Sequence, residues 1–306
     1  MSAHTAQPTE RPDPLRIWLM AARPRTLPAA VAPVLVGTAL AATGGTFRPV
    51  TFVAALLGAM FIQIGTNLSN DYSDARRGAD TEDRLGPVRV TAGGLVPPRQ
   101  VLRATYLAFG LAVLAGVYLI ATSGWQLLLV GAASILAGVL YTGGPRPYGY
   151  EGLGEVFVFL FFGVVAVAGS YFAQTEHLAW EAFVLAVPVG LLASAILVVN
   201  NVRDLETDRR AGKRTSAVRL GRTRVRGLYA AMVYGAFACA PLAWLLGGDG
   251  LTAWLLLPWL AVPLAVPVVR IVRNRTDGPA LNGALARTGM LQLAFCALLS
   301  AGLLAS

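Results

Sequence analysis

The sequence predicts an all-α protein, a polytopic membrane bundle of about nine transmembrane helices. Of its 306 residues, 56% are hydrophobic and only 13% are charged, and the mean hydropathy is +0.61. Water-soluble domains carry about 25% charged residues. A spanning helix needs about 20 mostly apolar residues, so nine of them would take up roughly 180 residues. No sizeable soluble domain is therefore expected.

The individual spans follow from apolar runs that are broken by glycine, proline or charge. In chain order they are 26–43, 50–70, 101–121, 124–142, 153–174, 178–200, 226–246, 251–270 and 284–305. Residues 1–15 are polar and proline-containing, and we expect them to be a disordered cytoplasmic N-terminus. Residues 16–306 are then expected to form a single integral-membrane domain.

When the nine spans cross the membrane alternately in chain order, nearly all basic residues lie on one side. Of the 25 Lys and Arg residues, all but Arg48 lie in the N-terminal segment or near the loops after spans two, four, six and eight. Since cytoplasmic loops are enriched in Lys and Arg, we expect a multi-pass protein of the cell membrane with a cytoplasmic N-terminus. The net charge of +9 is spread over short loops, so no nucleic-acid partner is expected.

Acidic residues concentrate in two of these loops, directly after spans two and six, which hold half of the 16 in the chain. The two segments read Asn67-Leu-Ser-Asn70-Asp71-Tyr-Ser-Asp74 and Asn200-Asn201-Val-Arg203-Asp204-Leu-Glu-Thr-Asp208. Both contain an Asn, three residues and then an Asp. On a helix, residues with spacings of four and of seven or eight share a face. The resulting stripes are Asn67, Asp71 and Asp74 in the first segment, and Asn200, Asp204 and Asp208 in the second.

Two stripes of oxygen donors without His or Cys favour a hard cation, Mg²⁺ by preference. Such an ion typically takes one or two carboxylates together with phosphate oxygens and water. The same loops carry phosphate-binding cations, namely Arg76, Arg77, Arg209, Arg210, Lys213 and Arg214, with Arg146 between them. Carboxylates for a metal beside Arg and Lys are what a diphosphate leaving group requires. Solvated loops of mixed charge are the alternative, but the matching spacing in both segments favours a site.

At these motifs the chain resembles the UbiA superfamily of intramembrane prenyltransferases, whose members carry two Asp-rich motifs on a nine-helix bundle. The resemblance spans nearly the whole chain and also rests on residues 23–28 and 141–155. Within the superfamily the chain is most similar to the 1,4-dihydroxy-2-naphthoate polyprenyltransferases of menaquinone biosynthesis. The final Asp of the first motif is replaced by Gly78, with Asp80 two residues further on, a spacing similar to that of the naphthoate branch.

The resemblance implies Mg²⁺-dependent transfer of a polyprenyl group from polyprenyl diphosphate to 1,4-dihydroxy-2-naphthoate at the cytoplasmic face. Loss of CO₂ and diphosphate would give demethylmenaquinol. The expected metal ligands are Asp71, Asp74, Asp204 and Asp208, with Asn67 and Asn200 in support. The resemblance further implies that the diphosphate is bound by Tyr141, Arg146 and Lys213, with Arg76 as an additional candidate.

Several points stay open at the level of sequence. Glu155 and Arg146 are candidates for orienting or deprotonating the acceptor, and the Phe residues at 157, 159, 161 and 162 could shelter a prenyl cation. Another aromatic acceptor, such as 4-hydroxybenzoate, is an alternative. So is an ion-coupled transporter, although transporters place their ionisable groups near the bilayer midplane, whereas these acids lie at one edge. Prenyl chain length and oligomeric state are not determined.

Overall fold

The computed structural model describes residues 13–79, 85–246 and 252–306, and within these ranges it contains helices and no strand. The α-helices are α1 (Pro14–Ala22), α2 (Pro28–Thr43), α3 (Pro49–Arg76), α4 (Pro98–Ser123), α5 (Gln126–Leu140), α6 (Gly154–Val158), α7 (Ala166–Thr175), α8 (Trp180–Arg210), α9 (Ser216–Leu246), α10 (Val262–Asn274) and α11 (Gly278–Leu304). Three 3₁₀ segments are η1 (Pro24–Thr26), η2 (Tyr148–Glu151) and η4 (Ala253–Ala261), and a π-helical segment, η3, covers Phe159–Val165. The all-α prediction is confirmed.

Seven helical stretches in the described residues are long and apolar enough to cross a membrane. An eighth is obtained when Pro14–Thr26 and Pro28–Thr43, which meet at an angle of 51°, are counted as one bent span. α5 occupies the position of the fourth expected span but is shorter, with 15 residues. The expected count of nine is therefore approximate, and the multi-pass membrane character is clear.

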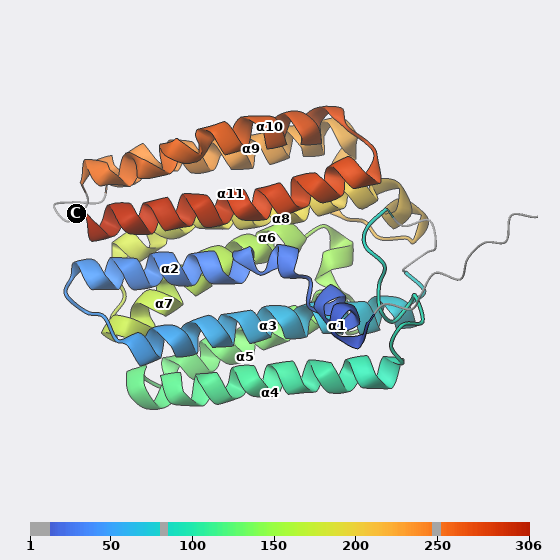
Figure 1. The fold of residues 1–306 in the computed structure, drawn as a ribbon, viewed down its shortest axis with the longest axis horizontal. Coiled ribbons are helices and arrows are strands. Elements are labelled where there is room, and N and C mark those ends of the chain that lie inside the picture. Colours follow the sequence, from blue (N-terminus) through green and yellow to red (C-terminus); the bar gives the residue numbers. More distant parts are fainter. Residues whose placement is uncertain (1–12, 80–84, 247–251) are drawn as a thin grey trace, which may run out of the picture.

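The long helices run side by side along the long axis of the molecule (Figure 1). α8 is the most buried of them. In its most apolar stretch of 18 residues, 72% of the residues are buried, against at most 50% in the corresponding stretches of the other spans. It packs against α9, α11 and η3, while α3 packs against α4 at the other side of the bundle. Because α3 and α8 both continue beyond the apolar part of their sequences, the two acidic segments are helical, as predicted.

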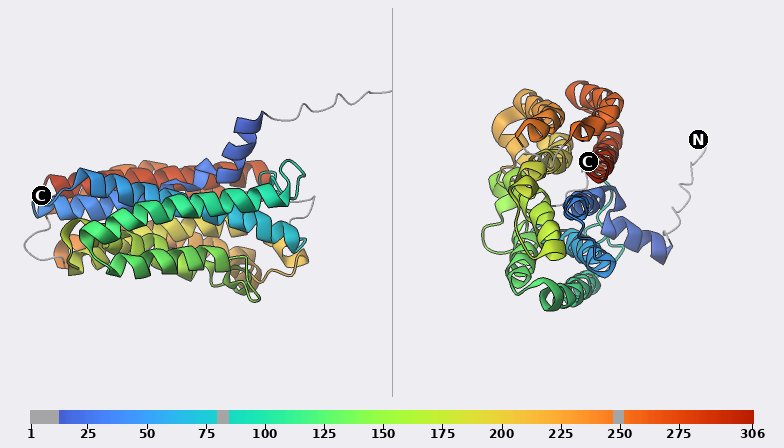
Figure 2. Two further views of the ribbon diagram at one scale, coloured as in Figure 1. Left: turned by 90° about the horizontal axis from the view of Figure 1, so that it is seen from below. Right: turned by 90° about the vertical axis from the view of Figure 1, so that its left-hand side faces the viewer.

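α1 stands out from the side of the bundle at one end (Figure 2). It begins at Pro14, inside the terminus expected to be disordered, while residues 1–12 lie outside the described part of the chain. Ile17 and Ala21 are buried against Leu68 of α3, whereas Leu15 on the opposite face is 67% exposed. The sequence prediction missed this helix because nine residues are too few for a periodic pattern to stand out.

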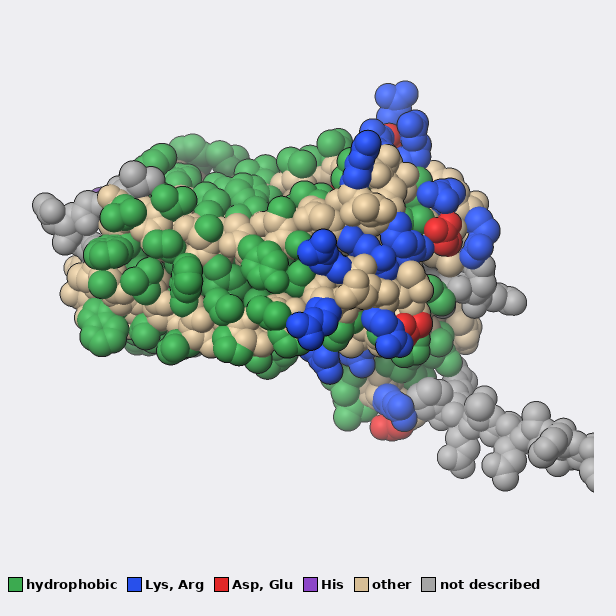
Figure 3. Space-filling view, turned by 90° about the horizontal axis from the view of Figure 1, so that it is seen from above, with side chains coloured by type: hydrophobic (Ala, Val, Ile, Leu, Met, Phe, Trp, Pro, Cys, Tyr) green, Lys and Arg blue, Asp and Glu red, His purple; other side chains and the backbone are tan. Residues whose placement is uncertain are grey.

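Charged side chains gather at one end of the molecule on the face shown in Figure 3, and hydrophobic side chains cover most of the remainder. The charged end is the end at which α3 and α8 finish. Such a surface, apolar along most of its length and basic at one end, is typical of a bundle embedded in a bilayer.

The π-helical segment η3 lies against α8 at a point where both helices carry glycine. A Cβ atom on Gly163 would lie only 2.6 Å from the Cα atom of Gly190, so neither position tolerates a side chain without a shift. π-helical turns are rare and occur frequently at functional sites. This segment connects α6 to α7, and several of its residues line the cavity of the candidate active site.

Candidate active site

A cavity of about 330 Å³ lies inside the bundle, between α2, α3, α4, α5, η3, α7 and α8. Its walls are largely apolar, and the polar side chains are concentrated toward the charged end of the molecule. Seven of the ten predicted site residues line it, namely Asn67, Asp74, Tyr141, Asn200, Asp204, Asp208 and Lys213. Two helices that are far apart in sequence therefore bring their acidic segments to the same cavity.

Three predicted residues do not line the cavity. Arg76 and Arg146 are exposed, and the Arg76 guanidinium donates to the Tyr72 hydroxyl at 3.1 Å. Asp71 is only 2% exposed but faces another part of the structure. Asp80, whose reach to a metal the sequence left open, lies outside the described residues.

Asp74 is the acidic residue of the first segment that reaches the cavity, and three cavity-lining residues from elsewhere in the chain surround it. The Tyr150 hydroxyl donates to its Oδ1 at 2.6 Å. The Lys213 ammonium is 3.2 Å from Oδ2 and the Arg89 guanidinium is 3.7 Å from the same oxygen. A carboxylate that is 2% exposed is thereby compensated by two cations and a hydroxyl.

Asp71 points away from the cavity, and its carboxylate binds the loop that follows α3. Its Oδ2 accepts from the Val90 N–H at 3.1 Å and its Oδ1 from the Thr91 N–H at 2.9 Å. At 3.6 residues per turn, Asp71 lies about 60° from Asp74 around the helix, and Asn70 lies about 40° from Asp74 on the opposite side.

The cavity is on the Asn70 side of the helix, and Asn70 lines it with its Oδ1 accepting from the Thr142 hydroxyl at 2.9 Å. The sequence prediction paired Asn67 with Asp71, four residues later. It overlooked Asn70 and Asp74, which have the same spacing.

In the second segment, Asp204 is held by the residue that precedes it. The Arg203 guanidinium donates through Nε to Oδ1 at 2.8 Å and through Nη2 to Oδ2 at 2.6 Å, and both residues are buried. The same guanidinium also donates to the amide oxygens of Asn200 and Asn282, each at 2.8 Å. Two neighbouring amide oxygens therefore add hydrogen bonds to the guanidinium of this buried ion pair.

Oxygen donors suited to Mg²⁺ face the cavity from both segments. Among the described residues, no group of three or more His, Cys, Asp or Glu side chains is arranged to hold a metal ion. Mg²⁺ does not require such a group, because it binds through one or two carboxylates plus phosphate oxygens and water. The donors Asp74, Asp204, Asp208, Asn70 and Asn200 therefore fit this ion in their chemistry.

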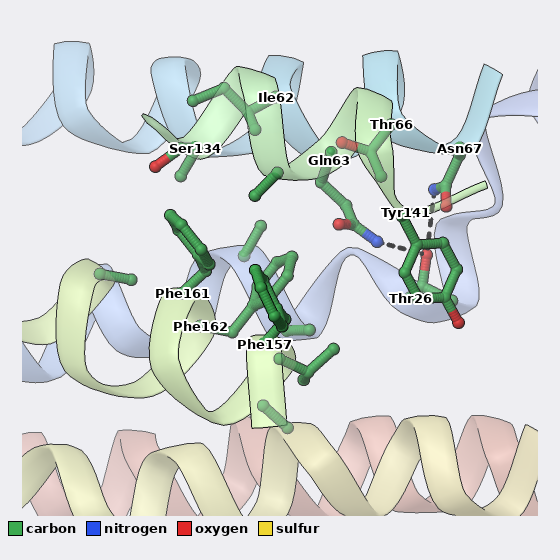
Figure 4. Close-up of a pocket in the computed structure, with 18 of the residues that line it drawn as sticks. Thr26, Ile62, Gln63, Thr66, Asn67, Ser134, Tyr141, Phe157, Phe161 and Phe162 are labelled. Atoms are coloured by element: carbon green, nitrogen blue, oxygen red, sulfur yellow. Dashed lines mark hydrogen bonds between the residues drawn. The ribbon is translucent and has the colours of Figure 1, made fainter. Parts of the chain in front are cut away.

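A second polar cluster lines the cavity deeper along α3. Gln63 and Asn67 both donate to the Thr26 hydroxyl, at 3.1 and 3.2 Å, and Asn67 also donates to the Ala22 carbonyl at 3.0 Å (Figure 4). Arg23, which ends α1, lines the same region with a left-handed backbone (φ 54°) that non-glycine residues adopt rarely. Asn67, expected to support a metal, thus holds the corner between α1 and α2 in place.

Aromatic rings form the wall opposite α3. Phe157, Phe161 and Phe162 line the cavity (Figure 4), and Tyr148 stacks on Phe157 with ring centroids 3.9 Å apart. Burial raises the pKa of the Tyr148 phenol, which stays protonated and donates to the Ala137 carbonyl at 2.9 Å. Glu155, considered as an acceptor-orienting group, instead accepts from the Asn201 amide at 2.8 Å and from the Ser216 hydroxyl.

The model of the UbiA prenyltransferase family matches residues 30–303. The chain belongs to the UbiA prenyltransferase family. It is 41% identical over 277 residues to the 1,4-dihydroxy-2-naphthoate octaprenyltransferase of Escherichia coli (strain K12), covering 89% of each chain. It is 43% identical over 288 residues to the enzyme of that name from Mycobacterium tuberculosis, covering 94% of this chain and 96% of the relative.

Solved structures share the fold. A UbiA homolog from Archaeoglobus fulgidus bound to GPP and Mg²⁺ superposes with a TM-score of 0.66 at 16% identity, covering 95% of this chain and 100% of that one. The apo structure of a UbiA homolog from Aeropyrum pernix K1 gives a TM-score of 0.66 at 15% identity, covering 90% and 97%.

Several cavity residues of this UbiA prenyltransferase were not among the predicted site residues: Arg23, Asn70, Arg89 and Tyr150. The spacing of Asn70 and Asp74 was available in the sequence as a signal. Tyr150 lies in η2, within residues 141–155 that support the family resemblance, but its contact with Asp74 was not predicted. Arg89 lies in a loop whose path over the cavity depends on tertiary contacts.

Proposed function

We propose that this UbiA prenyltransferase transfers a polyprenyl group from polyprenyl diphosphate to 1,4-dihydroxy-2-naphthoate, releasing diphosphate and CO₂ and forming demethylmenaquinol. The observation that carries the proposal is the convergence of Asp74, Asp204 and Asp208 on one cavity with Lys213 at hydrogen-bond distance from Asp74. The naphthoate octaprenyltransferases among the relatives support the choice of donor and acceptor.

The charged end of the cavity is the proposed diphosphate site. One or two of the carboxylates of Asp74, Asp204 and Asp208, with the amide oxygens of Asn70 and Asn200 nearby, would hold Mg²⁺ together with phosphate oxygens and water. Bound there, the ion would supply positive charge to counter the negative charge that develops on the leaving diphosphate. Lys213 and Tyr141 would contact the phosphate oxygens directly.

The reaction forms one bond and breaks two. The allylic C–O bond of the donor breaks, and its electron pair leaves with the diphosphate. A ring carbon of the acceptor bonds to the allylic carbon, and the bond between ring and carboxylate breaks, so that CO₂ leaves and its pair returns to the ring. The allylic carbon is cation-like during transfer, and the faces of Phe157 and Phe161 would shelter it from water.

The deeper polar cluster is the proposed acceptor site. Asn67 precedes Asp74 by seven residues, which corresponds to about 10 Å along the helix. A bicyclic acceptor between these levels would have its ring beside the allylic carbon of the donor. Arg23 would pair with the acceptor carboxylate, and Thr26 and Gln63 offer hydrogen bonds to the ring hydroxyls.

We also propose that the cavity opens at the cytoplasmic face of the cell membrane and that the N-terminus is cytoplasmic. The basic residues support this orientation, because all but Arg48 of the 25 lie in the N-terminal segment or near loops of the side that carries Asp74 and Asp208. The polyprenyl tail would lie along the apolar walls of the cavity toward the opposite end.

The test is an assay of the purified protein in detergent with Mg²⁺, a labelled polyprenyl diphosphate and a panel of aromatic acids. We expect prenylated naphthoate together with labelled CO₂ from a carboxyl-labelled acceptor, and no product after addition of a chelator. Prenylated 4-hydroxybenzoate formed without CO₂ would instead assign the protein to another acceptor. Substrate flux in proteoliposomes without any prenylated product would favour a transporter and overturn the proposal.

A further inference from the structure

The segment of residues 85–97, which leads into α4, lies over the charged end of the cavity. Within it, the Arg89 carbonyl accepts from the Gly93 N–H at 2.9 Å, and the Val90 carbonyl accepts from the N–H groups of Leu95 and Val96 at 3.0 Å. Val90 is fully buried in a small core with Ile17 of α1 and Leu68 of α3. The path of residues 89–96 is therefore fixed by packing and by its own hydrogen bonds.

Two polar anchors attach this loop to the rest of the bundle. At residues 90 and 91, both carboxylate oxygens of Asp71 accept backbone N–H groups, at 3.1 and 2.9 Å. At residue 85, the carbonyl accepts from the Asn282 amide of α11 at 3.0 Å. Gly86 lies against the Arg203 guanidinium, where a Cβ atom would come within 2.8 Å of Nη2.

Arg89 immediately precedes the residues that Asp71 holds, and its side chain turns into the cavity. It lines the cavity, is 10% exposed, and lies 3.7 Å from the Asp74 carboxylate. Fixing the N–H groups of residues 90 and 91 fixes the backbone from which this side chain departs. A guanidinium that is buried beside the candidate diphosphate site offers a forked set of donors to phosphate oxygens.

We propose that Asp71 is a positioning residue that acts through Arg89, and that Arg89 binds the diphosphate of the donor. This inference rests on the proposed function, because it assigns the diphosphate to the charged end of the cavity. The two acids of the first segment then have different roles. Asp74 faces the cavity, and Asp71 holds the loop that covers the cavity. From sequence, both acids were expected to be metal ligands. The following experiment distinguishes that expectation from a positioning role of Asp71.

The experiment compares Asp71→Asn, Arg89→Gln, the double variant and Asp74→Asn as the matched control on the same helix. An Asn side chain offers one acceptor oxygen, so Asp71→Asn loses one of the two loop hydrogen bonds and the charge of the other. We expect both Asp71→Asn and Arg89→Gln to raise the KM for prenyl diphosphate by about tenfold, the usual lower bound for loss of an outer-shell partner. The double variant should be no worse than Arg89→Gln, because residues that act in series are not additive.

A second readout is Mn²⁺ binding, followed by electron paramagnetic resonance without any substrate. Mn²⁺ affinity should not fall in Asp71→Asn or Arg89→Gln, because neither change removes a carboxylate that faces the cavity, and it should fall in Asp74→Asn. Equal losses of Mn²⁺ affinity in Asp71→Asn and Asp74→Asn, or additive KM effects in the double variant, would overturn the inference in favour of direct metal binding by Asp71.

Hydrogen exchange keeps the test valid if Asp71→Asn is less stable. We expect faster exchange at the amides of Val90 and Thr91 in this variant, with the amides of α3 protected as in the wild type. Unchanged exchange at those two amides would contradict the anchoring role. If the wild-type protein makes no prenylated product at all, the proposed function fails, whereas a working wild type with unaltered Arg89→Gln kinetics refutes this inference alone.

Discussion

The two acidic segments have the same Asn-x-x-x-Asp spacing but are held in place in different ways. At the end of α3, Asp74 is surrounded by Tyr150, Lys213 and Arg89, which come from three other parts of the chain. At the end of α8, Asp204 is held by its chain neighbour Arg203. The first segment is thus assembled from loops, and the second is largely formed within a single helical turn. The geometry of the first depends on folding of the loops, whereas the second is fixed as soon as α8 is packed.

The largest effect should come from removing a carboxylate that faces the cavity. Asp74→Ala should reduce Mg²⁺-dependent diphosphate release by about 10²-fold to 10³-fold, as expected when an electrostatic contribution to the transition state is lost. The comparison is with Asp71→Asn, whose loss should be about an order of magnitude. Release of diphosphate from a labelled donor measures both. Equal losses in the two variants would remove the distinction between the acids of the first segment.

Arg203→Ala tests whether the ion pair with Asp204 holds the second segment in place. Removing one partner of a buried ion pair leaves an uncompensated charge and should lower the free energy of unfolding by about 3–5 kcal/mol. Arg209→Ala on the same helix is the control, because Arg209 is 55% exposed and pairs with the exposed Glu206; it should cost less than about 1 kcal/mol. Thermal unfolding in detergent measures both, and similar midpoints would show that Arg203 does not hold the segment.

Lys213→Gln addresses the link between the two segments, since Lys213 follows the second segment in sequence and contacts Asp74 of the first. We expect the KM for prenyl diphosphate to rise or kcat to fall by about tenfold, because a charge-assisted contact is lost. Lys213→Arg should retain part of the activity. Steady-state kinetics with varied donor provide the measurement, and unchanged constants in Lys213→Gln would exclude a phosphate-binding role.

The smallest effect is expected for Tyr150→Phe, which removes the hydroxyl that donates to Asp74 and keeps the ring. The ring also faces the Lys213 ammonium, 4.8 Å from its centroid, and this contact should persist. Loss of one hydrogen bond corresponds to about 0.5–1.5 kcal/mol, or roughly a twofold to tenfold change in activity. A loss as large as that of Asp74→Ala would indicate that the hydroxyl itself contacts the substrate.

The sequence alone predicted those features of the molecule that depend on residues close together in the chain. Spans were predictable because each is a long apolar run, and the stripe of Asn200, Asp204 and Asp208 because helical spacing is regular. The rotation of α3 about its own axis was not predictable. It is set by contacts such as that of Gly65 with Phe109 of α4, where a Cβ atom would lie 2.6 Å from the ring. This rotation turns Asn70 toward the cavity and Asp71 toward the loop.

The residues missed by the sequence prediction, Arg89 and Tyr150, share a physical reason. Their positions depend on distant partners: Asp71 holds the loop next to Arg89, and the Tyr150 carbonyl accepts from the Arg214 N–H at 2.9 Å. These pairings span 19 and 20 residues in the first case and 64 residues in the second, and such tertiary contacts leave no periodic pattern in the chain. They become visible only when the helices have been placed.

The π-helical segment Phe159–Val165 limits how this cavity can change in evolution. Wider turns accommodate one more residue than an α-helix would over the same length. Deleting that residue would restore regular winding and leave α6 and α7 nearly in register, but it would move the aromatic side chains within the segment to new positions around its axis. Natural or engineered variation of substrate size in this wall should therefore arise by exchanging side chains, while changes in chain length are confined to the loops.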